Sequence, residues 1–228
     1  MSDKFRHEYK YLVSDQQIVL LQQRLKFLIP FDSHASEDGI YSIRSLYFDD
    51  YNDRCLKENI AGVAPREKFR IRIYNCDSTR ITLECKRKEH DKVQKKSCPL
   101  TIEQCVKLMN GEVLTDLGSQ PTVLKKLTLE MMTHMMQPKI IVGYDRMPYV
   151  NRLGNVRVTL DMNLYSSKDI RRFLEEDISK RPVMPKGQHL MEVKWDEFIP
   201  DTIFRACQLE NLRQTAYSKY SLCRKYKL

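Results

Sequence analysis

Polar and apolar residues alternate through several segments of the chain and predict β-strands that are buried on one face only. The alternation is clearest in 68–74 (KFRIRIY) and 80–86 (RITLECK), and the residues between them are of hairpin-loop length. The same pattern predicts strands at 4–13, 41–48, 139–150, 156–164 and 188–195, and a weaker one within 87–98. Because these strands are mostly connected as hairpins, we expect one antiparallel sheet or barrel.

Helical periodicity appears between these strands. It predicts helices over 15–28, 101–109 and 121–137, and from Thr202 towards the C-terminus. The first helix is preceded by a capping box, with Ser14 at the N-cap and Gln17 three residues later. Residues 54–65 are weakly patterned and receive no element. Since no linker or repeat interrupts the pattern, we predict a single α+β domain over residues 1–228.

The composition of the chain indicates which class of partner it binds. The formal net charge is +9, with 42% hydrophobic and 30% charged residues, which is typical of a soluble globular protein. A basic chain favours an anionic partner such as nucleic acid, a membrane surface or a phosphorylated small molecule. No run of about 18 apolar residues is present, so we do not expect an integral membrane protein.

The cysteines indicate a reducing environment. There are seven, an odd number, and none forms a CxxC pair. A disulfide framework or a zinc site is therefore disfavoured, and free thiols in a cytoplasmic protein are expected. The N-terminal residues also lack the apolar core of a secretory signal.

The polar faces of the predicted strands carry mainly Lys, Arg and Glu. Lys68, Arg70 and Arg72 share one face of their strand, opposite Phe69, Ile71 and Ile73. The other charged faces include Arg6, Glu8, Lys10, Glu84, Lys86, Arg157, Glu192 and Lys194. An ordinary solvated face would hold more Ser, Thr, Asn and Gln, and neighbouring like charges destabilise a sheet. We therefore predict a surface that binds an anion.

The residue types indicate phosphate and a metal ion. The planar fork of Arg can donate two hydrogen bonds to a phosphate, and Lys adds positive charge. Glutamates among these cations cannot bind phosphate directly, but they can hold Mg²⁺ or Mn²⁺, which binds phosphate oxygens. For any single glutamate, an ion pair with a neighbouring Arg or Lys explains its presence equally well. If the strands close into a barrel, the charged faces converge on its lumen and the helices cover the outside.

Taken together, the motifs resemble the triphosphate tunnel metalloenzyme (CYTH-like) superfamily. Within it they are most similar to the vacuolar transporter chaperone (VTC) domain, a polyphosphate polymerase fold. The resembling segments span nearly the whole chain in the family's order, and they are 6–13 (RHEYKYLV), 45–49 (SLYFD), 68–74 (KFRIRIY), 83–86 (LECK), 144–146 (YDR), 156–161 (VRVTLD), 191–194 (MEVK) and 217–220 (YSKY).

The resemblance implies an eight-stranded antiparallel β-barrel, a triphosphate tunnel with a charged lumen. It implies phosphate contacts for Lys10, Lys68, Arg70, Arg72, Lys86, Arg146, Arg157, Ser218 and Lys219. The arginines of this set and Lys86 would also take part in catalysis. Glu192 would hold the metal, with Glu8 and Glu84 as helpers. One of Lys95 or Lys96 would act at the tunnel mouth, and the sequence does not choose between them.

The expected function is a metal-dependent polyphosphate polymerase. It would transfer the terminal phosphoryl group of a nucleoside triphosphate, ATP above all, to a polyphosphate chain and release the nucleoside diphosphate. Arg6 occupies the place of the first glutamate in the superfamily's Glu-x-Glu-x-Lys signature, which favours a polymerase over a hydrolase of tripolyphosphate or nucleoside triphosphates. A non-catalytic protein that binds polyphosphate or nucleotides is a further alternative. Nucleic acid is disfavoured, because the charged faces are poor in aromatic residues for base stacking.

Overall fold

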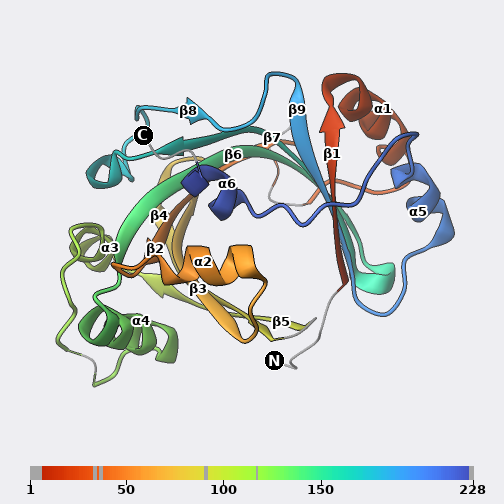
Figure 1. Ribbon diagram of the computed structural model, residues 1–228. Coiled ribbons are helices and arrows are strands. Elements are labelled where there is room, and N and C mark those ends of the chain that lie inside the picture. The colour runs from red at the N-terminus through yellow and green to blue at the C-terminus, as the bar shows by residue number, and fades with distance from the viewer. Residues whose placement is uncertain (1–6, 33–34, 36–37, 90–91, 117, 226–228) are drawn as a thin grey trace. The chain divides into compact units, whose positions relative to one another are not determined.

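The computed structural model describes residues 7–32, 35, 38–89, 92–116 and 118–225, and it is shown in Figure 1. The chain forms two compact units, each assembled from separate segments. Unit 1 consists of Met1–Ser42, Tyr144–Leu164 and Met184–Tyr217, and unit 2 of Ile43–Gly143, Tyr165–Val183 and Ser218–Leu228. The single domain expected from the sequence stays a prediction.

The strands form one antiparallel sheet. They are β1 (His7–Ser14), β2 (Tyr41–Asp49), β3 (Arg66–Tyr74), β4 (Asp77–Glu89), β5 (Lys92–Leu100), β6 (Gln137–Asn151), β7 (Val156–Ser167), β8 (Arg181–Pro182) and β9 (Gln188–Trp195). The hydrogen-bonded order is β1-β9-β7-β6-β2-β3-β4-β5, with β8 paired to β7. Among the described residues this path ends at β1 and at β5, so the sheet is not closed. The expected eight-stranded barrel is therefore confirmed only as an antiparallel sheet with helices.

The helices are α1 (Asp15–Leu25), α2 (Arg54–Ala61), α3 (Ile102–Met109), α4 (Thr122–His134), α5 (Asp201–Cys207) and α6 (Lys219–Lys225), together with short 3₁₀ turns at Leu153–Asn155 and Ile170–Arg172. The capping box of α1 is present as predicted: the Ser14 side chain accepts from the backbone N–H of Gln17, whose side chain accepts from the backbone N–H of Ser14. A second capping box joins Thr101 and Gln104 at the start of α3.

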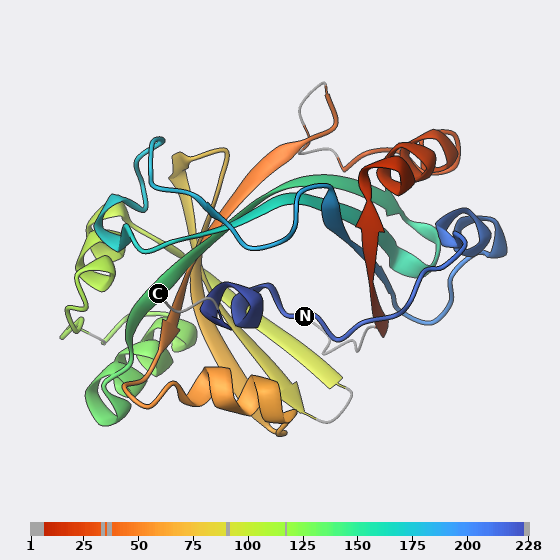
Figure 2. The ribbon, with the colours of Figure 1, turned by 45° about the horizontal axis from the view of Figure 1, so that its top comes forward.

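Unit 1 buries the apolar faces of its strands beneath two helices. Alternate residues of β7 and β9, among them Val158, Leu160 and Val193, form one hydrophobic cluster with Leu21 of α1 and Ile203 of α5. In Figures 1 and 2, α1 and α5 lie side by side next to β1. The charged residues of these strands alternate with the buried ones, so they project from the other face of the sheet.

In unit 2, strands β3 and β4 also bury one face and direct their charged residues to the other. Phe69, Ile71 and Leu83 are fully buried on one face. Helix α4 contacts β4 and β5, and its Lys126 reaches Glu67 on the face that carries Phe69, at 2.6 Å. The amphipathic helix therefore covers the apolar face, as expected. The charged face of β3 and β4 is left for the candidate site.

A tight turn joins β3 to β4. Only Asn75 and Cys76 lie between the strands, and both have positive φ, 48° and 55°. Two consecutive residues with positive φ are the mark of a type I′ hairpin, whose twist matches that of the flanking strands. The predicted hairpin is thus confirmed, with a shorter loop and longer strands than the sequence suggested.

Three expected elements are corrected. Residues 54–61 are helical although their pattern is weak, because buried Asp49 accepts hydrogen bonds from the backbone N–H groups of Cys55 and Leu56 and so caps the start of α2. The first helix ends at Leu25 rather than at residue 28. The C-terminal stretch is two short helices, separated by residues 208–218, rather than one. The predicted strand residues 4–6, and with them Arg6, lie outside the described part of the chain.

All seven cysteines are free, as expected, and six of them are buried. Burial raises the pKa of the Cys105 thiol to about 12, and that of Cys223 also to about 12. These thiols are therefore neutral and poorly reactive at neutral pH. Within the described ranges, no helix combines the length and the apolar character needed to span a membrane.

Candidate functional site

A row of three lysines crosses β3, β4 and β5 in unit 2. Lys68 is the cross-strand partner of Lys86, and Lys86 is the partner of Lys95. Directly opposed side chains lie close together on the same face of a sheet, where like charges destabilise the pairing. Such a row is explained if an anion lies over it.

The next row of the same face is built around Glu84. Arg70 faces Glu84 across the strands, and its guanidinium contacts the Glu84 carboxylate at 2.6 and 2.7 Å. Arg72 and Lys95 approach the same carboxylate at 3.8 and 3.1 Å. Neighbouring β2 contributes further contacts, because Arg70 donates to the Tyr47 hydroxyl at 2.8 Å. Glu84 thus holds three cations together.

The Glu84 carboxylate remains ionised in this setting. Burial alone would raise its pKa, but the charges of Arg70, Arg72 and Lys95 hold it well below its usual range. The side chain is only 4% exposed. Glu84 therefore positions these three cations in the structure, and its role as a metal helper, which the resemblance implied, stays a prediction.

The register distinguishes Lys95 from Lys96. Lys95 is paired with Lys86 and donates to Glu84 on the charged face. Lys96 is paired with Cys85, which belongs to the opposite, apolar face. Of these two lysines, Lys95 is therefore the one that can act together with Lys68 and Lys86.

Ser218, immediately before helix α6, lies at the charged face of unit 2, and Lys219 is the first residue of that helix. The Lys68 ammonium lies 3.5 Å from the Ser218 hydroxyl and 5.6 Å from the centre of the Tyr220 ring. The Tyr220 hydroxyl in turn donates to the fully buried Asp49. The Arg224 side chain of the same helix is bound by Asp53. Asp49, which also caps α2, therefore fixes the position of α6.

Tyr220→Phe is expected to loosen α6. The change leaves one buried oxygen of Asp49 without its hydroxyl donor, which costs about 1–3 kcal/mol. Urea denaturation would measure this loss, and limited proteolysis would locate it near the C-terminus. The matched control is Tyr51→Phe, since Tyr51 is 78% exposed. Equal stability of the two variants would show that the contact with Asp49 does not hold the helix.

Unit 1 carries a second cluster, in which acids and bases alternate. Glu8 is paired with Lys194, and Lys10 with Glu192, across β1 and β9. The Lys194 ammonium lies 2.9 Å from Glu192 and 3.6 Å from Glu8, and the Lys10 ammonium lies 2.8 Å from Glu8. The structure thus joins Glu8, Lys10 and Glu192, which the sequence proposed, with Lys194, to which it gave no role.

Two arginines border this cluster. Arg146 makes a bidentate pair with Asp161, at 2.6 and 2.8 Å, and lies 3.9 Å from Glu192. Burial would lower the pKa of Arg146, but Asp161 raises it well above its usual value, so the side chain stays charged. Arg157, the cross-strand partner of Lys194, donates to Asp32 at 3.0 Å and to the Tyr41 hydroxyl at 2.8 Å. Asp161 is a partner that the sequence analysis did not single out.

The VTC domain model matches residues 5–227, nearly the whole chain. The chain belongs to the VTC domain family. This membership supports a function related to polyphosphate or nucleotides and dependence on a divalent metal, without indicating which metal. No curated protein sequence matches the chain.

Solved structures bear on the fold of this VTC domain. A candidate adenylate cyclase from Bacillus halodurans is similar to it, with a TM-score of 0.52, 13% identity, and coverage of 90% of this chain and 87% of that one. A protein from Pyrococcus horikoshii OT3 has a TM-score of 0.49 and 13% identity, and covers 97% of this chain and 100% of its own. At 13% identity, the similarity to the Bacillus halodurans protein shows only that the two chains share a fold.

The unit 1 cluster of the VTC domain offers two carboxylates to the divalent metal ion that the family implies, and lysines contact both of them in this structure. Glu192 and Glu8 offer hard oxygen ligands, and the buried hydroxyl of Thr159, the cross-strand partner of Glu192, has no hydrogen-bond partner among the described residues. Among all the residues that the structure describes, no group of three His, Cys, Asp or Glu side chains is arranged to hold a metal. Mg²⁺ and Mn²⁺ sites with few carboxylates are completed by water and substrate phosphates, so a metal held by these two glutamates would need a phosphorylated substrate to complete its coordination.

Proposed function

We propose that this VTC domain is a polyphosphate polymerase, which transfers the terminal phosphoryl group of a nucleoside triphosphate to a polyphosphate chain. The observation that carries the proposal is the row of Lys68, Lys86 and Lys95 beside Arg70 and Arg72. Cations at successive cross-strand positions, about 4.8 Å from strand to strand, can neutralise several charges of a phosphate chain that lies across the strands. Family membership supports the same class of ligand.

Each side chain has a role in the proposed reaction. Arg70 and Arg72, oriented by Glu84, donate hydrogen bonds to the transferring phosphoryl group, and Lys86 adds positive charge there. Lys68, Ser218 and Lys219 bind neighbouring phosphates, with Lys95 beside them. In unit 1, Lys10, Arg146 and Arg157 contact further phosphate oxygens. When bound by Glu192 and Glu8, a Mn²⁺ or Mg²⁺ ion would neutralise charge on the phosphates.

The nucleophile in this proposal is a terminal phosphate of the growing chain. It is already anionic and needs no base, so that positioning and charge neutralisation supply most of the catalysis. A hydrolase of tripolyphosphate or nucleoside triphosphates would instead have to orient and deprotonate a water molecule. The described charged faces of both units contain carboxylates mostly bound by cations, which favours transfer to a phosphate over attack by water.

Product analysis tests the proposal. The purified protein is incubated with ATP and Mn²⁺, and the products are separated on a polyacrylamide gel that resolves phosphate chains. We expect polymer that lengthens with time. Free phosphate without polymer would establish the hydrolase instead, and binding of ATP or polyphosphate without any product would establish a non-catalytic binding protein.

Lys86→Gln is expected to weaken tripolyphosphate binding about tenfold at low salt, because one charge-assisted contact is lost from the centre of the lysine row. The dependence of the affinity on salt should also become less steep, since one fewer charge is screened. Titration calorimetry at two salt concentrations would measure both effects. The control is Lys125→Gln, which removes the same charge from the exposed surface of α4 in the same unit. If both variants bind alike, the row does not contact phosphate.

A further inference from the structure

Unit 1 has a cavity on the face of β1 and β9 that is opposite its charged cluster. We propose that this cavity is a second ligand site, which takes a small, flat aromatic molecule without negative charge. The proposal does not depend on the polymerase activity, because no residue of the charged cluster lines the cavity.

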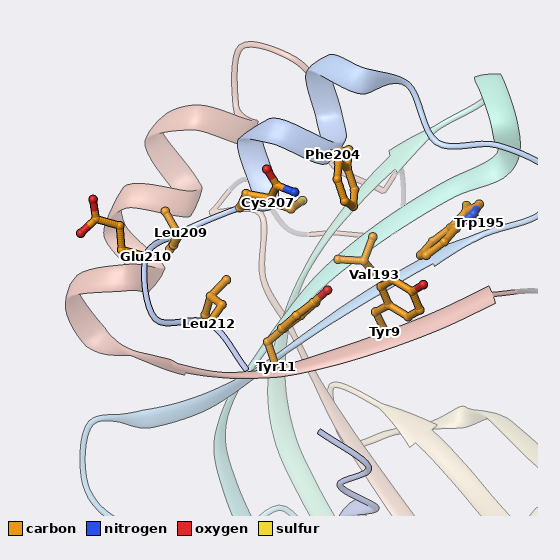
Figure 3. A pocket seen from close by; sticks show the side chains of 10 residues that line it. Tyr9, Tyr11, Val193, Trp195, Phe204, Cys207, Leu209, Glu210 and Leu212 are labelled. Atoms are coloured by element: carbon orange, nitrogen blue, oxygen red, sulfur yellow. The ribbon is translucent and has the colours of Figure 1, made fainter. Parts of the chain in front are cut away.

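The floor of the cavity consists of alternate residues of two paired strands. Tyr9 and Tyr11 come from β1, and Val193 and Trp195 from β9. Tyr9 is the cross-strand partner of Val193, so the four side chains project from one face. The rings of Tyr9 and Trp195 meet edge to face, with centroids 4.8 Å apart. Figure 3 shows these rings in a line along the strands.

The roof is formed by α5 and the segment that follows it. Phe204 extends from α5 towards Val193, and Leu209 and Leu212 close the far end (Figure 3). Between floor and roof lies a volume of about 520 Å³. This is within the range of sites that bind drug-sized molecules, roughly 300–1,000 Å³.

The walls are held in place by hydrogen bonds within unit 1. Arg24 of α1 donates to the carbonyl oxygen of Gln208 at 2.9 Å, and the Gln17 side chain donates to that of Glu210 at 3.4 Å. Thr215 donates its backbone N–H to the carbonyl oxygen of Lys10 at 2.8 Å. The segment over the cavity is therefore tied at both ends before any ligand binds, which lowers the ordering cost of binding.

The lining selects against anions. It contains no Lys, Arg or His, although the whole chain has a net charge of +9. Its one carboxylate, Glu210, points away from the rings in Figure 3. Burial, followed by the nearby Tyr9 and Cys207, raises the pKa of Tyr11, whose hydroxyl is a neutral donor and acceptor. Aromatic walls with a few neutral polar groups favour a flat, uncharged ring system that stacks and accepts a hydrogen bond.

A tryptophan in the lining allows binding in the cavity to be measured by fluorescence. Trp195 is the only tryptophan of the chain, so all energy transfer from tryptophan to a bound dye originates there. The probe is dansyl amide, an uncharged aromatic dye. The matched anion is the sulfonate of the same ring system, 5-(dimethylamino)naphthalene-1-sulfonate. We expect saturable energy transfer to dansyl amide and at least about tenfold weaker binding of the sulfonate, the ratio that a difference of about 1.4 kcal/mol gives. Absence of saturable transfer, or equal binding of the two dyes, would overturn the proposal.

Substitutions in the lining test whether the dye binds in the cavity. Phe204→Ala removes one aromatic wall and should weaken dansyl amide binding about fivefold. Phe198→Ala, which removes an exposed ring elsewhere in unit 1, should not change it. Leu212→Phe fills the cavity and should also weaken binding, which keeps the test decisive if Phe204→Ala fails to fold. Unchanged affinity in both cavity variants would show that the dye binds elsewhere.

Discussion

Glu192→Gln is expected to reduce polymer formation about 1,000-fold while the protein still binds polyphosphate. A carboxylate that holds a divalent ion contributes several kcal/mol of charge stabilisation in the transition state, and about 4 kcal/mol corresponds to this factor. Gln keeps the shape of the side chain and can still accept from Lys194, so the fold should persist. Initial rates of polymer synthesis and calorimetric titration with polyphosphate would measure the two effects.

Direct metal binding separates a metal ligand from an ion-pair partner in this variant. Electron paramagnetic resonance of Mn²⁺ should show bound ion in the wild-type protein with tripolyphosphate, and much less in Glu192→Gln. Glu197→Gln is the matched control, because Glu197 is exposed just beyond the end of β9. A variant that binds Mn²⁺ and synthesises polymer like the control would exclude Glu192 from the metal site.

Arg70→Met is expected to lose both phosphate affinity and stability. The Glu84 carboxylate, 4% exposed, would lose its two shortest contacts, and breaking a buried ion pair from one side costs about 3 kcal/mol. Affinity for tripolyphosphate should fall at least tenfold, since a bidentate donor is lost. Arg80→Met, an exposed change on the same strand as Glu84, is the control for both measurements.

A double variant distinguishes the loss of stability from the loss of phosphate affinity. Arg70→Met with Glu84→Gln no longer buries a poorly compensated charge, so it should recover most of the stability but none of the affinity. Because the pKa of Glu84 is lowered in the folded protein, its contribution to stability is complete above the usual glutamate pKa of about 4.3 and is lost as the pH falls below it. The wild-type protein should therefore lose its stability advantage over Glu84→Gln on acidification. A constant difference across this pH range would show that Glu84 does not stabilise the fold through its charge.

Much of the sheet could be predicted from the sequence. Period-two alternation in 68–74 and 80–86 identifies the strands and also the face on which each side chain lies, because one face is buried. Helix α2 was missed because its start depends on Asp49, a buried carboxylate whose role appears only when β2 and residues 55–56 are brought together. The break between α5 and α6 was missed for a similar reason, since the intervening segment is held by Arg24 and Gln17 of α1.

The candidate site was predictable in its residue types but not in its pairings. The segment MEVK already places Lys194 on the face of Glu192, yet the sequence does not reveal that this lysine lies between two glutamates. Likewise, the LECK segment places Glu84 among cations without showing that three of them surround one carboxylate. Strand register places Lys95, and not Lys96, on the face of Lys86, and register depends on pairing between segments that a single strand pattern does not specify.

The fate of the terminal phosphoryl group of ATP tests the proposed function most directly. ATP labelled in its γ-phosphate is incubated with the protein, Mn²⁺ and short polyphosphate, and the label is followed into polymer, free phosphate and diphosphate. Transfer to the growing chain predicts that the label appears in polymer from the earliest times. Label that appears only as free inorganic phosphate would show that the protein is a hydrolase rather than a polymerase.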